Sequence, residues 1–139
     1  MQILGKHLIV EYAGCDRSIL DNLEALEKSL CEAVRKAGAT IVNATFHRYN
    51  PQGVSGVVVI AESHMSIHTW PEYGYAAVDF FTCGEECNPT LAHEFMVKAL
   101  GSDNFSVKEM PRGIPSERTE RIMHKAPATF PHVSSPNRV

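Results

Sequence analysis

The sequence predicts an α+β fold, a two-layer sandwich in which two helices cover one face of a mostly antiparallel sheet. Strand-like and helix-like segments follow the order β-α-β-β-β-β-α-β, so the two halves form an internal pseudo-repeat. The 139 residues suit a single domain with a modest core. The segment 54–61 is apolar at nearly every position, which is typical of a strand buried on both faces. Because helices on one side leave the other sheet face bare, we expect a second copy to cover it in a homodimer that pairs through the sheets.

The first half of the chain supplies three strands and one helix. We expect strands at 7–12, 40–49 and 54–61 and a helix at 16–38. Apolar residues recur at helical spacing in the helix, and Gly38 is a natural stop. The sequence Asn50-Pro51-Gln52-Gly53 is a turn signal between the second and third strands.

The second half mirrors this arrangement, with its helix near the end. We expect strands at 65–70, 75–83 and 105–110 and a helix that begins after Asn88 and ends before Gly101. Asn88 is suited to cap that helix, and Pro89 suits its first position. The domain should therefore cover 1–110. Residues 111–139 are rich in Pro, Ser and Arg with few core-type residues, which predicts a mobile tail without chemistry.

Composition excludes several classes of function. A net charge of −3 without a basic run argues against a nucleic-acid partner. No apolar segment approaches the roughly 20 residues that cross a bilayer, and the start does not resemble a signal peptide, so we expect a cytoplasmic protein without a membrane partner. Four cysteines in a reducing compartment are expected to be thiols. Cys83 and Cys87 lack the second pair that a structural zinc site needs, so no metal is expected.

One short stretch gathers reactive groups. Residues 62–70 read ESHMSIHTW, and Cys83 ends the next predicted strand. His64 and His68 would lie about 13 Å apart on an extended strand, too far to share one metal ion. A serine hydrolase is another interpretation, with Ser63 as the nucleophile. The G-x-S-x-G spacing is absent and little chain remains for a hydrolase pocket, but a triad is recognised by geometry, so this alternative stays open.

Self-processing is a third interpretation of the same stretch. A serine hydroxyl can attack the preceding carbonyl and convert the Glu62–Ser63 amide to an ester. Elimination then cuts the chain and leaves a dehydroalanine at residue 63, which hydrolyses to a pyruvoyl group. An imidazole is a suitable base for the elimination. A pyruvoyl carbonyl forms a Schiff base with an amino acid and accepts the electron pair released with carbon dioxide. Pyridoxal phosphate usually serves this purpose, but a chain this short has little room to bind it.

The ordered motifs resemble those of the prokaryotic S-adenosylmethionine decarboxylases. Glu62-Ser63-His64 is followed by IHTWPEYGYAAVD at 67–79 and FTCG at 81–84. GKHL at 5–8 and GVSGVVV at 53–59 fit the same family. The resemblance covers roughly residues 3 to 101, and its longest motif is too specific to arise by chance.

The resemblance implies cleavage between Glu62 and Ser63 into 1–62 and 63–139, with the pyruvoyl group made from Ser63 as the Schiff-base cofactor. It implies that His68 is the base for processing, that Ser55 assists it, and that Cys83 is the proton donor after decarboxylation. A thiol suits that role because its pKa can be tuned near neutrality. The product is the aminopropyl donor for spermidine synthesis. Neither a metal nor pyridoxal phosphate is needed.

Substrate binding is predicted from chemistry and from the resemblance together. A sulfonium cation and an adenine ring both suit aromatic walls, for which Tyr49 and Trp70 are the candidates. Glu72 is suited to hold the ribose hydroxyls. Similar enzymes place these groups at a protomer interface, which agrees with the expected homodimer.

Two other functions remain open at this point. Relatives with the same pyruvoyl chemistry decarboxylate arginine or ornithine, and discrimination lies in the adenosine pocket. A non-catalytic binding module that keeps the fold and is never cleaved is the other alternative.

Overall fold

The computed structural model describes residues 3–114, which form an α+β sandwich of one sheet and one helical layer. All six strands belong to a single sheet with the order β2-β3-β4-β5-β1-β6, and every neighbouring pair is antiparallel. The strands are β1 (Gly5–Ala13), β2 (Ile41–Arg48), β3 (Val54–Ile60), β4 (Ser63–Trp70), β5 (Tyr75–Cys83) and β6 (Asn104–Arg112). The predicted fold class is confirmed.

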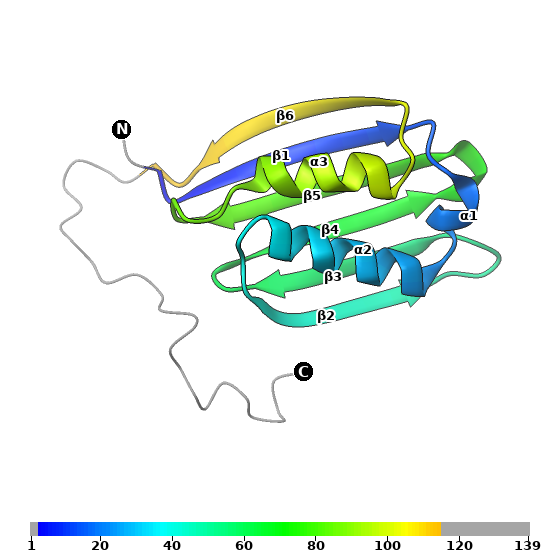
Figure 1. Cartoon of the computed structure of the whole chain (residues 1–139), viewed down its shortest axis with the longest axis horizontal. Coiled ribbons are helices and arrows are strands. Elements are labelled where there is room, and N and C mark those ends of the chain that lie inside the picture. The colour runs from blue at the N-terminus through cyan, green and yellow to red at the C-terminus, as the bar shows by residue number, and fades with distance from the viewer. Residues whose placement is uncertain (1–2, 115–139) are drawn as a thin grey trace.

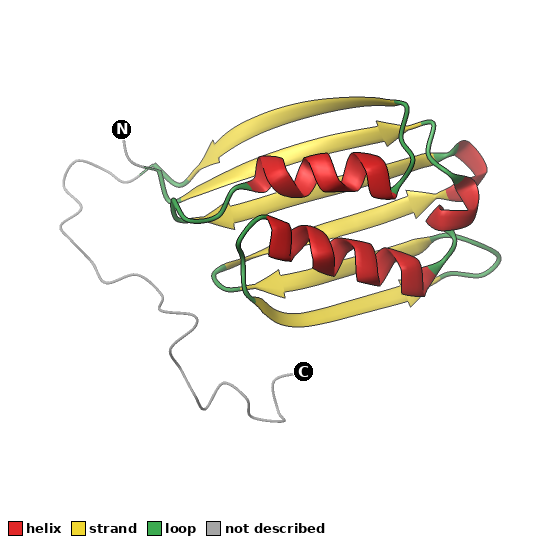
Figure 2. Cartoon of the chain, in the orientation of Figure 1, coloured by secondary structure: helices red, strands yellow, loops and turns green. Residues whose placement is uncertain are grey.

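Two long helices lie side by side on one face of this sheet, and they pack against each other (Figures 1 and 2). They are α2 (Leu23–Lys36) and α3 (Pro89–Ala99). α3 begins where the sequence predicts, with Asn88 accepting a hydrogen bond from the Thr90 amide and Pro89 at the first position. A 3₁₀ turn, η1 (Pro71–Tyr73), joins β4 to β5.

The single helix predicted over 16–38 is wrong in one respect, because it is broken into α1 (Arg17–Leu20) and α2. Asp16 caps α1 by accepting from the Ser18 and Ile19 amides, and Asn22 caps α2 by accepting from the Ala25 amide. Two capping residues six positions apart therefore start two helices. Asp21, between them, pairs with Arg48 at 2.7 Å and fixes the break against the end of β2.

The core lies between the helices and the sheet face beneath them. Leu26, Leu30 and Val34 of α2 and Met96 of α3 are fully buried against alternate residues of the strands. Along β4 the buried residues are Met65, Ile67 and Thr69. The opposite face of the sheet, which carries the intervening residues, has no covering layer within residues 3–114 and is called the open face below.

The open face bears on the prediction that the strand over 54–61 is buried on both sides. Within one chain β3 is covered only by the helices, and Val59 on the open face remains 39% exposed. Ile9 on β1 and Met110 on β6 are also exposed on this face. Burial of this face by a second copy stays a prediction.

The last strand, β6, runs to Arg112, so it extends past the domain end expected at residue 110. Most of the predicted tail, 115–139, lies outside the described residues. Among residues 3–114, no helix combines the length and the apolar character needed to span a bilayer.

Candidate active site

The peptide bond between residues 62 and 63 lies in the tight turn that joins β3 to β4. Ile60 pairs with Ser63, so Ala61 and Glu62 form a two-residue loop. Glu62 has a φ of 76°, and within residues 3–114 it is the only residue other than glycine with a positive φ. A side chain in this left-handed conformation costs about 1–2 kcal/mol, and glycine or asparagine is usual there. Backbone strain is therefore concentrated immediately before Ser63.

The hydroxyl of Ser63 is unusual because no group within residues 3–114 satisfies it. Its Oγ is buried and has no hydrogen-bond partner among the described residues. Buried polar atoms are nearly always paired, and an unpaired one costs about 1–3 kcal/mol. A free hydroxyl beside a strained peptide bond is the arrangement that attack on the Glu62 carbonyl requires.

Cys83 lies at the same carbonyl. Its Sγ donates a hydrogen bond to the Glu62 carbonyl oxygen at 3.5 Å. The β4–β5 register explains this contact, because His64 pairs with Phe81 and two positions outward the same register brings Cys83 opposite Glu62. Both residues line a cleft of about 520 Å³ at this end of the sheet, together with Thr40, Glu85 and Cys87. The structure thus brings Ser63 and Cys83 together, as the sequence analysis expects.

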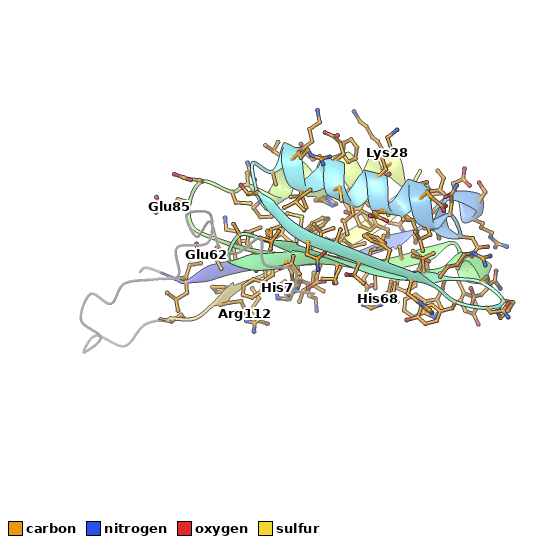
Figure 3. The ribbon with its side chains drawn as sticks, turned by 90° about the horizontal axis from the view of Figure 1, so that it is seen from below. His7, Lys28, Glu62, His68, Glu85 and Arg112 are labelled. Carbon is orange, nitrogen blue, oxygen red and sulfur yellow. The ribbon has the colours of Figure 1, made fainter. Side chains whose placement is uncertain are left out.

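A second pair of predicted residues meets elsewhere. Ser55 Oγ and His68 Nδ1 share a hydrogen bond at 2.7 Å, because the two residues are partners across β3 and β4. Both lie on the open face. His68 is five residues from Ser63 along the same strand, which is about 16 Å at 3.3 Å per residue. In Figure 3, Glu62 lies at one end of the sheet and His68 lies farther along its lower side.

The predicted substrate-binding residues lie farther still from Ser63. Trp70 ends β4, seven residues or roughly 23 Å from Ser63. Its ring packs on Tyr75 with centroids 5.3 Å apart, and Tyr49 packs on His47 at 4.7 Å. Glu72 lies in η1. These residues therefore gather at the opposite end of the sheet, and one chain alone does not assemble the predicted site.

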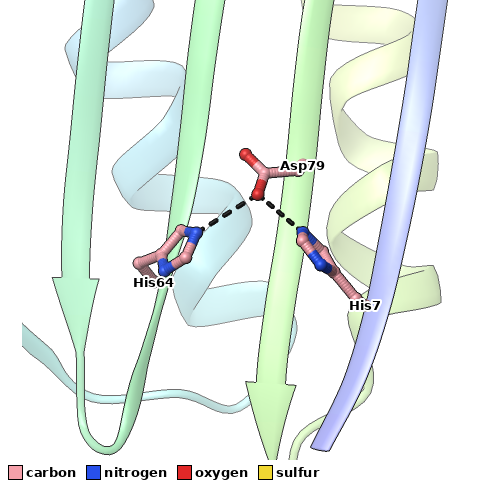
Figure 4. Close-up of side chains that lie close together, drawn as sticks. All are labelled: His7, His64 and Asp79. Carbon is pink, nitrogen blue, oxygen red and sulfur yellow. Dashed lines mark hydrogen bonds and ion pairs between the residues drawn. The ribbon is translucent and has the colours of Figure 1, made fainter. Parts of the chain in front are cut away.

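A further cluster on the open face was not found by the sequence analysis. Asp79 accepts hydrogen bonds through one oxygen from His7 Nε2 at 2.7 Å and from His64 Nε2 at 3.2 Å (Figure 4). Its other oxygen accepts the Ser66 hydroxyl. Burial raises the pKa of the Asp79 carboxyl, but the hydrogen bonds from Ser66, His7 and His64 outweigh it and hold the pKa below its ordinary value. Asp79 is therefore an anion at neutral pH.

Arg112 extends this cluster to the edge of the sheet. Its guanidinium donates to His7 Nδ1 at 2.9 Å and lies 5.0 Å from the centre of the Phe81 ring. A guanidinium has no acceptor, so Nδ1 of His7 must carry the lone pair and Nε2 the proton. Alternation along β4 places His64 and Ser66 on one face. His7 and Arg112 join them because β1 pairs with β5 and β6, and no local sequence pattern indicates that pairing.

Comparison with known proteins identifies the family of the chain. The S-adenosylmethionine decarboxylase family pattern matches residues 6–113. The chain belongs to the S-adenosylmethionine decarboxylase family.

Relatives and a solved structure support that assignment. An S-adenosylmethionine decarboxylase proenzyme of Thermodesulfovibrio yellowstonii is 51% identical over 125 residues, covering 90% of this chain and 93% of the relative. A proenzyme of the same name from Thermosipho melanesiensis is 57% identical over 113 residues, covering 81% and 87%. The crystal structure of the adenosylmethionine decarboxylase from Aquifex aeolicus superposes with a TM-score of 0.79 at 33% identity, covering 87% of this chain and all of that one. The predicted family is confirmed, whereas the roles of individual residues stay predictions.

Proposed function

We propose that this chain is a proenzyme that cuts itself between Glu62 and Ser63 and then decarboxylates S-adenosylmethionine. The observation that carries the proposal is the unpaired, buried Ser63 hydroxyl beside the strained Glu62 residue. The proenzyme names of its relatives support self-cleavage, and those names also specify the substrate.

The residues around Ser63 fit a pyruvoyl group. Cleavage converts the serine into a ketone and removes the buried hydroxyl that lacks a partner. The group supplies an electrophilic carbonyl that takes up the electrons released as carbon dioxide leaves. The thiol of Cys83 lies where it can donate a proton at that position, and its contact with the Glu62 carbonyl also favours charge on that oxygen during cleavage. No metal or added cofactor is part of this proposal.

The remaining half of the site comes from a second copy of the chain. The Ser55–His68 pair lies about 16 Å from Ser63 in the same chain, and proton transfer needs heavy atoms within about 3.2 Å. Both residues lie on the open face, which also exposes Val59, Ile9 and Met110. A two-fold axis that lies in the interface and runs across the strands reverses the second sheet, which brings its His68 end toward Ser63. The homodimer thus covers the apolar face and completes each site.

In this arrangement the substrate is held between two chains. Tyr49, Trp70 and Glu72 of one copy accompany its His68 toward the Ser63 of the other. Trp70 is 40% exposed on one chain and so remains available for stacking against a purine or a sulfonium. A preference for S-adenosylmethionine over arginine or ornithine follows from these aromatic groups. Carbon dioxide release from each labelled substrate in turn tests that preference.

Ser63→Ala tests the proposal directly. The wild-type chain should run as two fragments on a denaturing gel, with a pyruvoyl-blocked fragment that begins at residue 63. The variant should remain one uncut chain without activity, because it lacks the attacking hydroxyl. Ser106→Ala, on the exposed strand β6, is a matched control that should be cut normally. A wild-type protein that remains a single chain would instead support a binding module.

A further inference from the structure

The Asp79 cluster links four neighbouring strands at the level of the cleavage site. Arg112 belongs to β6, His7 to β1, Asp79 to β5, and His64 with Ser66 to β4. Figure 4 shows the two imidazoles converging on one carboxylate oxygen from either side of β5. His64 is the residue that follows Ser63, so this cluster reaches the backbone next to the predicted cut.

Cleavage changes what holds residue 63. In the intact chain Ser63 is paired with Ile60 across the hairpin turn, and that turn is lost when the bond to Glu62 breaks. His64 is the first residue paired on both sides, with Val59 of β3 and Phe81 of β5. Chain ends fray unless side-chain contacts or the backbone hydrogen bonds of a sheet hold them in place. The position of residue 63 after cleavage therefore depends on how firmly His64 is held.

Side-chain contacts hold His64 more firmly than its backbone pairing with β3 and β5 would do alone. Its Nε2 bonds to Asp79, and its ring meets Phe81 edge-on with centroids 5.6 Å apart. Phe81 is itself stacked on His7 at 4.9 Å. Because Asp79 is an anion, its hydrogen bond to His64 is charge-assisted and stronger than a neutral one.

The same groups also have the composition of a metal site, since Nε2 of both histidines and an Asp79 oxygen lie within 4.8 Å of one another. Two observations argue against this interpretation. The 2.7 Å separation between His7 Nε2 and Asp79 is a hydrogen-bond length, and Arg112 keeps the proton on that nitrogen. The guanidinium also places a positive charge beside the cluster. Hydrogen bonding therefore accounts for its geometry.

We propose that Asp79 is a positioning residue that anchors His64 and, through it, the chain end at residue 63. The proposal rests on the proposed function, because it concerns the end that cleavage creates. Asp79 holds the Ser63–His64 backbone against Cys83 before the cut and keeps the new end at the same place afterwards. His7 and Ser66 hold the carboxylate in turn, and Arg112 holds His7.

A double-mutant cycle tests whether Asp79 acts through His64. Asp79→Asn removes the charge, and His64→Phe keeps a ring against Phe81 without the donor. Each should slow cleavage and, in the cleaved protein, lower kcat about tenfold while KM changes less than about twofold. The double variant should be no worse than either single variant, because both remove one contact.

Two readouts separate positioning from a general loss of stability. The peptide that begins at residue 63 should exchange its amide hydrogens faster in Asp79→Asn, while peptides from α2 and α3 exchange as in the wild type. Mass spectrometry should also find more of the fragment that begins at residue 63 with an N-terminal alanine. That alanine forms when the proton after decarboxylation goes to the pyruvoyl carbon instead of the substrate α-carbon, so that hydrolysis of the Schiff base releases an aldehyde and leaves the substrate nitrogen on the chain. Glu32→Gln is the matched control, since this carboxylate pairs with Arg35 on α2, in the helical layer rather than on the open face.

Several outcomes overturn the proposal. Additive effects of the two substitutions show that Asp79 does not act through His64. If the wild type is cut and active and Asp79→Asn is cut and turns over substrate at the same rates, the positioning role is refuted while the proposed function stands. An uncut wild type refutes the proposed function and the anchoring role together. Tight binding of added zinc chloride that Asp79→Asn abolishes identifies the cluster as a metal site instead.

Discussion

The proposal that each site uses two chains makes a sharp prediction for mixed dimers. Take one chain with His68→Ala and another with Ser63→Ala, each carrying a different affinity tag. Five residues separate the two positions, about 16 Å along β4, whereas general base catalysis needs contact within about 3.2 Å. If His68 of one chain serves Ser63 of the other, a mixed dimer has one intact site and one that lacks both groups.

The expected result is specific to one chain. After co-expression and purification through both tags, the His68→Ala chain should be cut, because its Ser63 faces an intact His68. The Ser63→Ala chain should remain whole. Activity per dimer should be about half that of the wild type, since one of two symmetric sites is complete.

Each variant purified alone provides the control, and both should remain uncut. If His68 acted within its own chain, neither chain of the mixed dimer could be cut, since one lacks the base and the other the serine. An uncut mixed dimer therefore refutes the two-chain site. Cleavage of the His68→Ala homodimer at the wild-type rate refutes the role of His68 itself.

Three further predictions concern turnover, packing and pH. Cys83→Ala should still be cleaved but lose turnover about a hundredfold or protonate its product incorrectly, and an unchanged steady-state rate rules it out as the proton donor. Gly56→Ala should destabilise the fold by about 2 kcal/mol in urea unfolding, because its Cβ would lie 2.1 Å from the Phe46 ring; an unchanged midpoint contradicts this packing. Since the pKa of Asp79 is lowered on folding, its contribution to stability is complete above its unfolded pKa of about 3.9 and is lost as pH falls through the folded value. As pH falls, Asp79→Asn should therefore lose unfolding free energy less steeply than the wild type. An equally steep loss in both proteins argues against a lowered pKa of Asp79.

Local signals predicted most of the secondary structure. Asn88 and Pro89 locate the start of α3, and Tyr75 to Cys83 matches β5 at both ends. The break after α1 was missed although Asp16 and Asn22 are both capping residues, since apolar spacing continues through it. What fixes the break is the pairing of Asp21 with Arg48, which lies 27 positions along the chain.

For the site, too, the sequence indicated the residues that carry a motif but not the contacts between distant strands. A family motif identifies Ser63 and Cys83, and the structure places both at one peptide bond. The resemblance assigns Ser55 and His68 to processing at Ser63, but only the structure shows that they are partners across β3 and β4 and lie far from Ser63 in the same chain. The His7–Asp79 contact joins residues 72 positions apart and depends on β1 lying beside β5. Such contacts follow from strand order, for which alternating hydrophobicity gives no evidence.

If the chain is cut between Glu62 and Ser63 as proposed, the order of strands also decides what becomes of the two fragments. Residues 1–62 supply β1, β2 and β3, while residues 63–139 supply β4, β5 and β6. β1 is inserted between β5 and β6, so the fragments interleave and share three ladders, β3 with β4 and β1 with each of its neighbours. Severing the connecting hairpin leaves every one of these ladders in place. The nicked protomer should thus migrate as a single particle in native conditions, and its pieces should come apart only when the whole sheet is denatured.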